Sequence, residues 1–203
     1  MFLALDGPDG TGKTTQCQRL ADWLRECGRE VVLTKDPGGT EVGEQLREVL
    51  LGQRHPLAVE CEALLYMASR AQLVAKVIEP ALSAGKVVVC DRFLLANVVY
   101  QGHAGGLDPE ALWQVGRLCT GGRSPDVTLV LDMPAAEASA RRKRPADRVE
   151  SRSADYQERV RRGFQYEARR RPERMRVVDA GAPVAVVQEA IRQEVCGVLG
   201  LSR

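Results

Sequence analysis

The sequence predicts an α/β protein in which helices flank a parallel sheet, and three observations support this. Apolar runs rich in β-branched residues alternate with segments of helical periodicity along the chain. The apolar runs are continuous, as expected for strands that helices cover on both faces. A glycine-rich turn joins the first run to the first helical segment. The length of 203 residues suits one sizeable core, so we expect a single domain spanning residues 1–203.

The N-terminal part of the chain predicts a strand, a loop, a helix and a second strand. Residues 2–5 are an apolar run that ends at Asp6. Within residues 14–27 apolar side chains recur at helical spacing, and Gly28 suits the end of a helix. The apolar run at residues 30–34 predicts the second strand, covered on both faces.

Two helical segments and a third strand follow. A proline and two glycines within residues 36–39 force a turn. Helical spacing returns at residues 41–51 and again at residues 58–84. The most strand-like run, residues 87–90, leads directly into Asp91.

The C-terminal part predicts a further helix and two more strands around an arginine-rich segment. Residues 108–110 carry helix cap signals, and residues 127–131 and 175–178 are short apolar runs. Residues 141–176 hold thirteen arginines and one lysine against six acids, a local charge of +8 in a chain of net charge +2. We expect this segment to fold over a site at the ends of the strands.

The composition indicates a soluble protein without a membrane or nucleic acid as its partner. No run approaches the roughly 18 to 20 apolar residues that a membrane-spanning helix needs. The start, MFLALDGPDG, has no basic leader, so we expect no secretory signal and a cytoplasmic protein. The net charge of +2 gives no support to a nucleic-acid-coating protein. The six cysteines lack a zinc-binding spacing, and we expect most to be buried free thiols.

The strongest motif is a phosphate-binding loop. Residues 7–14 fit the pattern GxxxxGK[ST] between a predicted strand and a predicted helix, which makes a chance glycine-rich turn the weaker interpretation. Glycines let backbone N–H groups converge on an anion, and the start of the helix adds its unpaired N–H groups. We expect Lys13 to reach the β- and γ-phosphates of a nucleotide and Thr14 to bind Mg²⁺. The residues expected around the nucleotide phosphates are Gly7, Pro8, Asp9, Gly10, Thr11, Gly12, Lys13, Thr14 and Thr15.

A phosphate loop alone leaves kinases, GTPases, ATPases and motor-like proteins open. The chain has no NKxD guanine-binding motif, which weighs against a switch GTPase. Asp91 and Arg92 follow a predicted strand, at the edge of the sheet where the loop lies. There Asp91 can organise Mg²⁺ and its waters, and Arg92 can donate two parallel hydrogen bonds to a phosphate. A surface ion pair is the alternative for these two residues.

Six motifs together resemble those of bacterial thymidylate kinases in their order and spacing. They are DGPDGTGKTT (6–15), TKDPGGT (34–40), SRAQL (69–73), DRF (91–93), VVYQG (98–102) and ADRVE (146–150). The resemblance covers nearly the whole chain and implies a doubly wound P-loop fold of the nucleoside monophosphate kinase type. It also implies transfer of the γ-phosphoryl group of ATP to dTMP, giving dTDP for dTTP synthesis, with Mg²⁺ as cofactor and a homodimer as the assembly.

The resemblance assigns roles to residues around the acceptor nucleotide. Asp9 resembles the acid that holds the 3′-hydroxyl of the deoxyribose; a carboxylate beside a triphosphate needs such a donor. Arg92 resembles the clamp on the dTMP phosphate, with Lys35 as a second cation. Arg70 resembles the residue that binds O4 of thymine. Tyr66, one helical turn earlier, would stack on the ring.

Three further residues are expected at the acceptor. Asn97 and Gln101 lie four residues apart after the third strand and can contact the edge of the base. Tyr100 resembles the tyrosine that crowds the 2′ position of the sugar and so favours deoxyribose. Ordinary core packing is the alternative for this tyrosine and for Tyr66.

The arginine-rich segment resembles the lid of those family members that bring their catalytic arginine from the lid. Other members carry an arginine in the phosphate loop, where this chain has Gly10. We expect the lid at approximately residues 137–155, with Arg144 and then Arg142 as the catalytic candidates and Arg148 as a structural or phosphate contact. An arginine in reach of the transferring group contributes roughly 10³ to 10⁵ in rate.

Departures from the family pattern stand at Lys35, Asp36, Phe93 and Ala96. Lys35 stands where arginine is usual, so a bidentate contact to a phosphate becomes a point charge. Asp36 is one methylene shorter than the usual glutamate. The nearest alternative function is another nucleoside monophosphate kinase, with UMP, CMP or AMP as acceptor. A P-loop regulatory or nucleic-acid-associated protein is a more distant one, which the near-neutral charge opposes.

Overall fold

The computed structural model describes residues 1–52, 56–141, 147–149 and 151–199. In these residues, five parallel strands form one sheet in the order β2-β3-β1-β4-β5. The strands are β1 (Phe2–Asp6), β2 (Val31–Lys35), β3 (Val87–Asp91), β4 (Val127–Asp132) and β5 (Met175–Asp179). The predicted parallel sheet flanked by helices is therefore confirmed.

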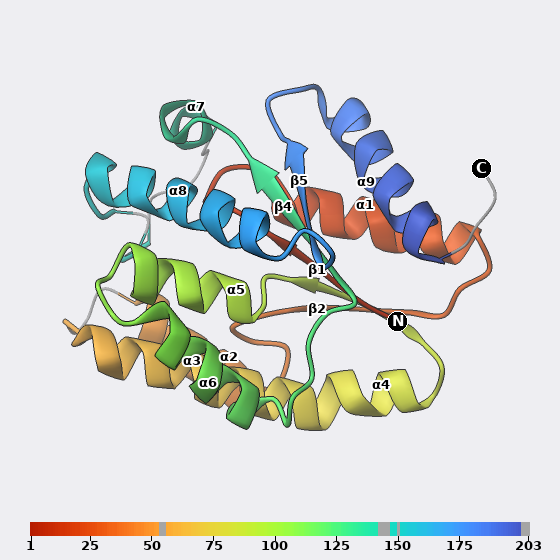
Figure 1. Cartoon of the computed structure of the whole chain (residues 1–203). Coiled ribbons are helices and arrows are strands. Elements are labelled where there is room, and N and C mark those ends of the chain that lie inside the picture. The colour runs from red at the N-terminus through yellow and green to blue at the C-terminus, as the bar shows by residue number, and fades with distance from the viewer. Residues whose placement is uncertain (53–55, 142–146, 150, 200–203) are drawn as a thin grey trace.

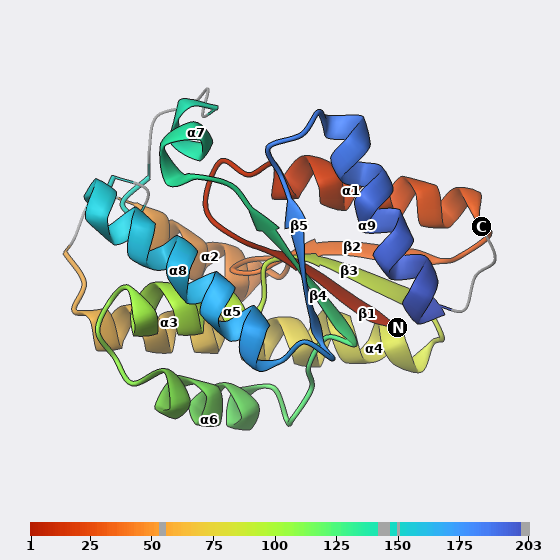
Figure 2. The same cartoon turned by 45° about the horizontal axis from the view of Figure 1, so that its top comes forward.

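Helices cover both faces of the sheet (Figure 1). The helices are α1 (Lys13–Glu26), α2 (Glu41–Leu51), α3 (Val59–Leu73), α4 (Glu79–Ser83), α5 (Leu94–Asn97), α6 (Pro109–Cys119), α7 (Ala135–Ala140), α8 (Ala154–Arg170) and α9 (Val184–Leu199). Two π-helical segments, η1 (Val74–Ile78) and η2 (Val98–His103), continue α3 and α5. The view of Figure 2 shows α1 and α9 side by side on one face and α3, α4 and α6 beyond the other.

The alternation of side chains along β1 explains the two layers. Leu3 and Leu5 belong to the apolar core under α1 and α9, whereas Phe2 and Ala4 belong to the core under α3 and α6. Successive residues of a strand point to opposite faces, so a continuous apolar run is what a central, doubly covered strand requires.

The strand register brings the polar strand ends to one edge of the sheet. Leu5 of β1 pairs with Asp91 of β3, and Lys35 of β2 pairs with the same aspartate. Asp6 follows Leu5 and ends β1. The carboxyl ends of three neighbouring strands thus place two acids and a lysine around the start of α1, as expected for a ligand site in an open α/β sheet.

β2 is covered on both faces, as expected, since Val31 and Leu33 pack against the core under α1 and α9 and Val32 packs against the core under α3 and α6. Its side chains are only half-buried, because it is an edge strand of the described sheet and pairs there with β3.

Two expectations about the fold need correction. Only two of the six free cysteines, Cys17 and Cys90, are buried. The C-terminal part of the arginine-rich segment does not cover the site, because it includes the helix α8, whose Val160 and Phe164 pack in the core beside β4.

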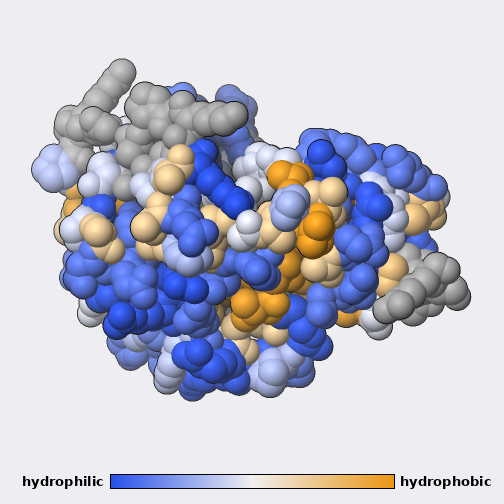
Figure 3. Space-filling model, turned by 90° about the horizontal axis from the view of Figure 1, so that it is seen from above, coloured by the Kyte–Doolittle hydropathy of each residue, from blue (hydrophilic) through white to orange (hydrophobic). Residues whose placement is uncertain are grey.

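The face seen from above is mostly hydrophilic, and its most hydrophobic side chains lie near the centre of the view (Figure 3). Within the part of the chain that the structure describes, none of the helices combines the length and apolar character that crossing a membrane requires.

Candidate functional site

The phosphate loop, residues 7–12, joins the buried strand β1 to α1. Gly7 has φ 133° and Gly10 has φ 87°, both in the left-handed region that favours glycine. A Cβ atom at Gly7 would overlap the carbonyl oxygen of Leu131, and one at Gly10 would overlap that of Ala138. Both positions therefore require glycine for the loop to pack this closely against β4 and α7.

The first turn of α1 is free to bind an anion. Gly12, at its N-cap, offers no capping side chain, and the first turn holds no acid. The unpaired N–H groups and the positive end of the helix dipole are thus available at the loop. Lys13 Nζ donates to the carbonyl oxygen of Pro8 at 2.7 Å, so a phosphate oxygen can replace this carbonyl as the acceptor.

The Lys13 ammonium lies in a desolvated place with cationic and anionic neighbours. Burial and, next, the Arg92 guanidinium lower the pKa of Lys13 to about 8, although nearby carboxylates such as Asp9 act in the opposite sense. Lys13 is therefore mostly charged at neutral pH, in a position where an anion would stabilise that charge further.

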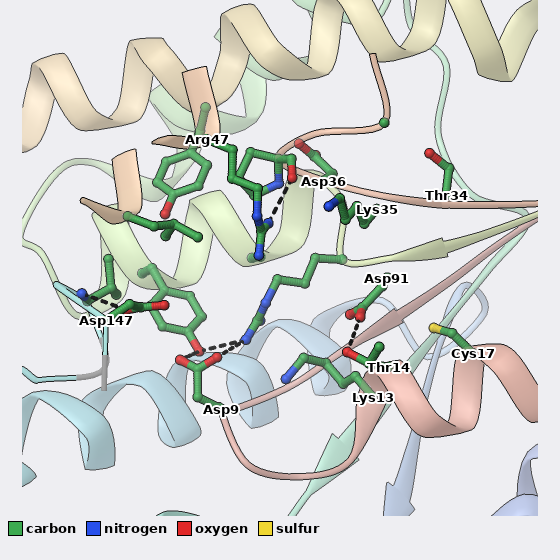
Figure 4. A pocket seen from close by; sticks show the side chains of 18 of the residues that line it. Asp9, Lys13, Thr14, Cys17, Thr34, Lys35, Asp36, Arg47, Asp91 and Asp147 are labelled. Atoms are coloured by element: carbon green, nitrogen blue, oxygen red, sulfur yellow. Dashed lines mark hydrogen bonds and ion pairs between the residues drawn. The ribbon is translucent and has the colours of Figure 1, made fainter. Parts of the chain in front are cut away.

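Thr14 and Asp91 form an oxygen pair that suits Mg²⁺. Thr14 Oγ1, in the first turn of α1, donates to Asp91 Oδ2, at the end of β3, at 2.5 Å (Figure 4). Mg²⁺ in phosphate-binding sites takes one or two protein oxygens and completes its shell with phosphates and waters. Among the described residues, no group of three or more His, Cys, Asp or Glu side chains could hold a metal. The pair thus fits an ion shared with a nucleotide.

Asp6 is a buried carboxylate at the end of β1, under the loop. Its Oδ2 accepts from the backbone N–H of Phe93 at 3.3 Å, and Oδ1 has no hydrogen-bond partner among the described residues. Burial raises the pKa of Asp6 to about 7, although the charges of Arg92 and Lys13 lower it. The site therefore contains a carboxyl group that is partly protonated at neutral pH.

Arg92 connects the loop to η2. Its guanidinium donates to the carbonyl oxygen of Gly7 at 2.9 Å and to the Asp9 carboxylate, and the Tyr100 hydroxyl donates to Asp9 Oδ2 at 2.7 Å. Burial tends to raise the pKa of Asp9, but the charges of Arg92 and Lys13 and these hydrogen bonds outweigh it and lower the pKa. Two protein donors thus contact the Asp9 carboxylate, and its contact with a sugar hydroxyl of the acceptor stays a prediction.

Tyr66 and Arg70 lie one turn apart on α3, and both line the cleft, as their spacing predicts. Arg70 is buried, and its Nε donates to Asp36 Oδ2 at 2.6 Å. Its Nη1 donates to Asn97 Oδ1 at 3.0 Å. Burial and, next, the charge of Glu62 raise the pKa of Tyr66 far above its ordinary value, so its hydroxyl stays protonated.

Three of the predicted substrate residues are held by neighbouring side chains. Asn97 Nδ2 donates to Gln101 Oε1 at 2.8 Å, and both residues are buried in the wall of the cleft. Lys35, at the end of β2, is half-exposed, and its Nζ lies 3.1 Å from Glu44 Oε1. Lys35 therefore has to exchange an ion pair in order to bind a phosphate.

Arg47 of α2 is a cation of the cleft wall that the sequence analysis missed. Its Nη1 donates to the carbonyl oxygen of Pro37 at 2.8 Å (Figure 4). A signal for Arg47 was present in its position on the helix. It lies four residues after Gly43 and three residues before Leu50, so all three share one face, and the other two residues of that face are buried.

These groups line one cleft of about 1260 Å³. The predicted residues that line it are Asp9, Gly10, Gly12, Lys13, Thr14, Thr15, Lys35, Tyr66, Arg70, Asp91, Arg92, Asn97, Tyr100 and Gln101. Gly7, Pro8 and Thr11 are not among the lining residues and instead support the loop, for example through the Thr11 hydroxyl, which donates to the carbonyl oxygen of Pro8 at 3.0 Å.

The two arginines expected to be catalytic, Arg142 and Arg144, lie outside the described residues. Arg141 precedes them and Asp147 and Val149 follow them, and all three line the cleft. The chain thus enters and leaves the segment 142–146 at the cleft wall.

The comparisons with known proteins agree with one another. Residues 5–191 match the family model described as thymidylate kinase. The chain is 47% identical over 198 residues to a thymidylate kinase of Desulfosudis oleivorans, with 92% of each chain covered. It is 45% identical over 201 residues to one of Symbiobacterium thermophilum, with 98% of this chain and 94% of the relative covered. A crystal structure of thymidylate kinase from Ehrlichia chaffeensis superposes with a TM-score of 0.81 at 30% identity, covering 96% of this chain and 98% of that one.

Proposed function

The chain belongs to the thymidylate kinase family, whose members transfer a phosphoryl group from ATP to dTMP, and we propose that this transfer takes place in the cleft described above. One observation carries the proposal: a phosphate loop and a wall suited to a pyrimidine line the same cleft, with Arg92 between them. A cleft of about 1260 Å³ has room for two nucleotides end to end.

The acceptor dTMP occupies the end of the cleft formed by α3 and η2. Tyr66 stacks on the thymine ring, and Arg70 donates to its O4. Tyr100 excludes a 2′-hydroxyl. Arg92 turns from Asp9 to the acceptor phosphate, with Lys35 as the second cation.

ATP occupies the loop end. The N–H groups of Asp9, Gly10 and Gly12 and those of the first turn of α1 bind its phosphates, and Lys13 contacts the transferring group. Thr14 and Asp91 would hold Mg²⁺, which neutralises phosphate charge when bound. The protein needs no covalent intermediate, since it works by alignment of the two nucleotides and by neutralisation of charge.

The lid completes the site within a chain that acts as one domain. Residues 137–155 bring Arg144, or Arg142, to the phosphoryl group during its transfer. Gly10 cannot supply this charge, which is the reason for assigning it to the lid. The enzyme works in the cytoplasm, where ATP and dTMP are available to it.

The acceptor is tested by comparing dTMP, dUMP, UMP, CMP and AMP in a coupled assay of ADP release. We expect dTMP to give a higher kcat/KM than UMP, CMP and AMP, because O4 of thymine meets the guanidinium of Arg70 and its sugar lacks the 2′-hydroxyl that Tyr100 excludes. The same two features are present in dUMP, which lacks only the 5-methyl group. A preference for AMP or CMP would overturn the assignment of the acceptor.

Affinity for ATP is expected to fall as pH rises above about 8. In the free protein Lys13 loses its proton through that range, whereas a bound triphosphate favours the charged form and restores a higher pKa. Binding then takes up a proton, so the affinity drops by up to about tenfold per pH unit above 8 and stays level below it. Titration calorimetry from pH 7 to 9.5 checks this. Lys13→Arg should remove the dependence, and a level wild-type profile would contradict it.

We further propose that the chain forms a homodimer through α2, α3 and α6. These neighbouring helices expose Val42, Val49, Leu64 and Leu118, of which Leu118 is 83% exposed. Exposed large apolar side chains on helices that pack against one another suit an interface. Light scattering should give twice the mass of one chain for the wild type and for the control Val198→Asp on α9, but one chain mass for Leu64→Asp. A monomeric wild type would contradict the proposal.

A further inference from the structure

A second pocket, separate from the cleft, lies where the end of η2 meets α6 and α8. Its volume is about 600 Å³, which is within the range of small-molecule sites, and it shares no lining residue with the cleft. The segment η2 packs against both helices. The residues that line the second pocket are His103, Pro109, Glu110, Arg159, Arg162, Gly163, Tyr166, Arg169 and Arg170.

The second pocket is strongly cationic. Among the described residues that line it, four are arginines of α8 and one, Glu110, is an acid, which gives a formal charge of +3 with His103 counted as neutral. Residues 159, 162, 166, 169 and 170 recur at helical spacing and are all exposed, so they share one open face of α8. Such a concentration of positive charge favours a ligand that carries several negative charges.

The arginines of the second pocket can exchange their present partners for an anion. Arg169 has no acidic partner among the described residues. Arg162 lies 3.1 Å from Glu158, but its side chain is 75% exposed. Exposed ion pairs contribute little to stability, whereas a phosphate accepts two parallel hydrogen bonds from one guanidinium. The ion pairs to be exchanged are Arg159 with Asp155, Arg162 with Glu158 and Arg170 with Glu110.

Planar groups add a stacking surface to these charges. The Tyr166 ring is 46% exposed, and the guanidinium carbon of Arg170 lies 5.6 Å from its centroid. The His103 ring lies 5.2 Å from the Tyr166 ring in an edge-on arrangement. Aromatic rings and guanidinium planes are the groups on which proteins stack nucleobases. The second pocket therefore combines arginines suited to phosphates with a stack suited to a base.

The floor of the second pocket is built by close packing of α8 against η2. A Cβ atom at Gly163 would lie 2.9 Å from the Cβ atom of His103, so the two elements approach as closely as they do because position 163 is glycine. The His103 ring is held from below, since its Nε2 lies 2.7 Å from Oε1 of the fully buried Glu167. Trp113 Nε1 donates to the other oxygen of Glu167 at 3.2 Å. A floor that is already fixed loses less freedom when a ligand binds.

We propose that the second pocket binds a nucleoside triphosphate, with the arginines of α8 on its phosphates and its base extending the stack of Arg170 and Tyr166. Residues 159–170 cover about 16 Å along the helix, and the volume of about 600 Å³ suits one nucleotide and not a strand of nucleic acid. The pocket uses only the start of α6, eight residues before Leu118 of the proposed dimer face. The proposal does not depend on the reaction proposed for the cleft.

Titration calorimetry with AMP-PNP and Mg²⁺ tests the proposal. We expect the wild type to bind two molecules per chain, one in the cleft and one in the second pocket. Arg162→Gln with Arg169→Gln should weaken the second binding event about 100-fold or more, roughly tenfold for each guanidinium lost, and leave kcat unchanged. Arg25→Gln with Arg29→Gln is the matched control, since both arginines are exposed and Arg25, like Arg162, is paired with an acid on its own helix. This control should still bind two molecules.

Two further variants assign the binding events and test the role of the base. Lys13→Met should lose the event in the cleft and keep the one in the second pocket. Tyr166→Leu should weaken AMP-PNP in the second pocket about tenfold, because it removes the ring from the stack. The same variant should leave the affinity for inorganic tripolyphosphate unchanged, since no charge is altered.

A wild-type chain that binds one molecule of AMP-PNP would overturn the proposal, as would a second event that the folded Arg162→Gln and Arg169→Gln variant leaves unchanged. A second event that tripolyphosphate reproduces with equal affinity, and that Tyr166→Leu does not alter, would reject the nucleotide as the ligand. Tighter binding of short single-stranded DNA than of AMP-PNP would also reject it. Should the double variant not fold, Arg169→Gln alone carries the test, because Arg169 has no ion pair to lose among the described residues.

Discussion

Arg92→Met is expected to lower kcat/KM for dTMP by roughly 10³-fold or more, the scale reported for an arginine at a transferring phosphoryl group. Arg92 is held by Gly7 and Asp9 where the two nucleotides are expected to meet. Its loss removes the acceptor clamp and leaves the Asp9 carboxylate close to the phosphates, with the Tyr100 hydroxyl as its remaining side-chain donor among the described residues. Steady-state kinetics with dTMP varied at saturating ATP measure the effect.

Arg123→Met provides the matched control for this change. It removes the same charge from an exposed ion pair with Glu79, which is not part of the cleft. Its kcat/KM should remain at the wild-type value, and ATP affinity should change little in Arg92→Met. A loss smaller than about tenfold in Arg92→Met would mean that Arg92 does not align the acceptor.

Gly10→Ala is expected to reduce kcat by about 10²-fold, the cost of displacing catalytic groups by about 1 Å. The new Cβ would overlap the carbonyl oxygen of Ala138, a backbone atom of α7 that cannot rotate away. The loop then has to move relative to α7, and the N–H groups that bind phosphate move with it. Turnover and ATP affinity together report the displacement.

Gly28→Ala is the control for the backbone strain in that variant. Gly28 has φ 77°, and no atom lies within 4 Å of the position its Cβ would take. This variant carries the cost of a left-handed alanine, about 1 to 2 kcal/mol in the free energy of unfolding, without an overlap. It should retain wild-type turnover, and equal losses in both variants would assign the effect of Gly10→Ala to strain alone.

The fold was predictable where local pattern and global structure agree. The continuous apolar runs at 2–5 and 87–90 are strands of the sheet interior, and the glycine-rich loop lies between a strand and a helix as the motif requires. The edge position of β2 was not predictable, because an apolar run at 30–34 is compatible with either place in a sheet. Strand order depends on pairing between distant segments, which periodicity does not report.

The site was predictable as far as its residues belong to motifs. A guanidinium on an apolar helix needs a hydrogen-bonding partner, so a partner for Arg70 was expected. Only the structure identifies Asp36 as that partner. Glu62 has the sequence signature of an ordinary first-turn acid, and it is buried because Gln101 and Arg152, distant in sequence, pack against it. Contacts of this kind depend on tertiary packing.

The most direct test of two nucleotides held end to end is a crystal structure with dTMP and a non-hydrolysable ATP analogue bound together. We predict the thymine ring between Tyr66 and Arg70, the triphosphate against Lys13, and the acceptor phosphate at Arg92. An empty cavity beside Tyr66 and Arg70 at saturating dTMP, or dTMP bound elsewhere, would contradict this arrangement.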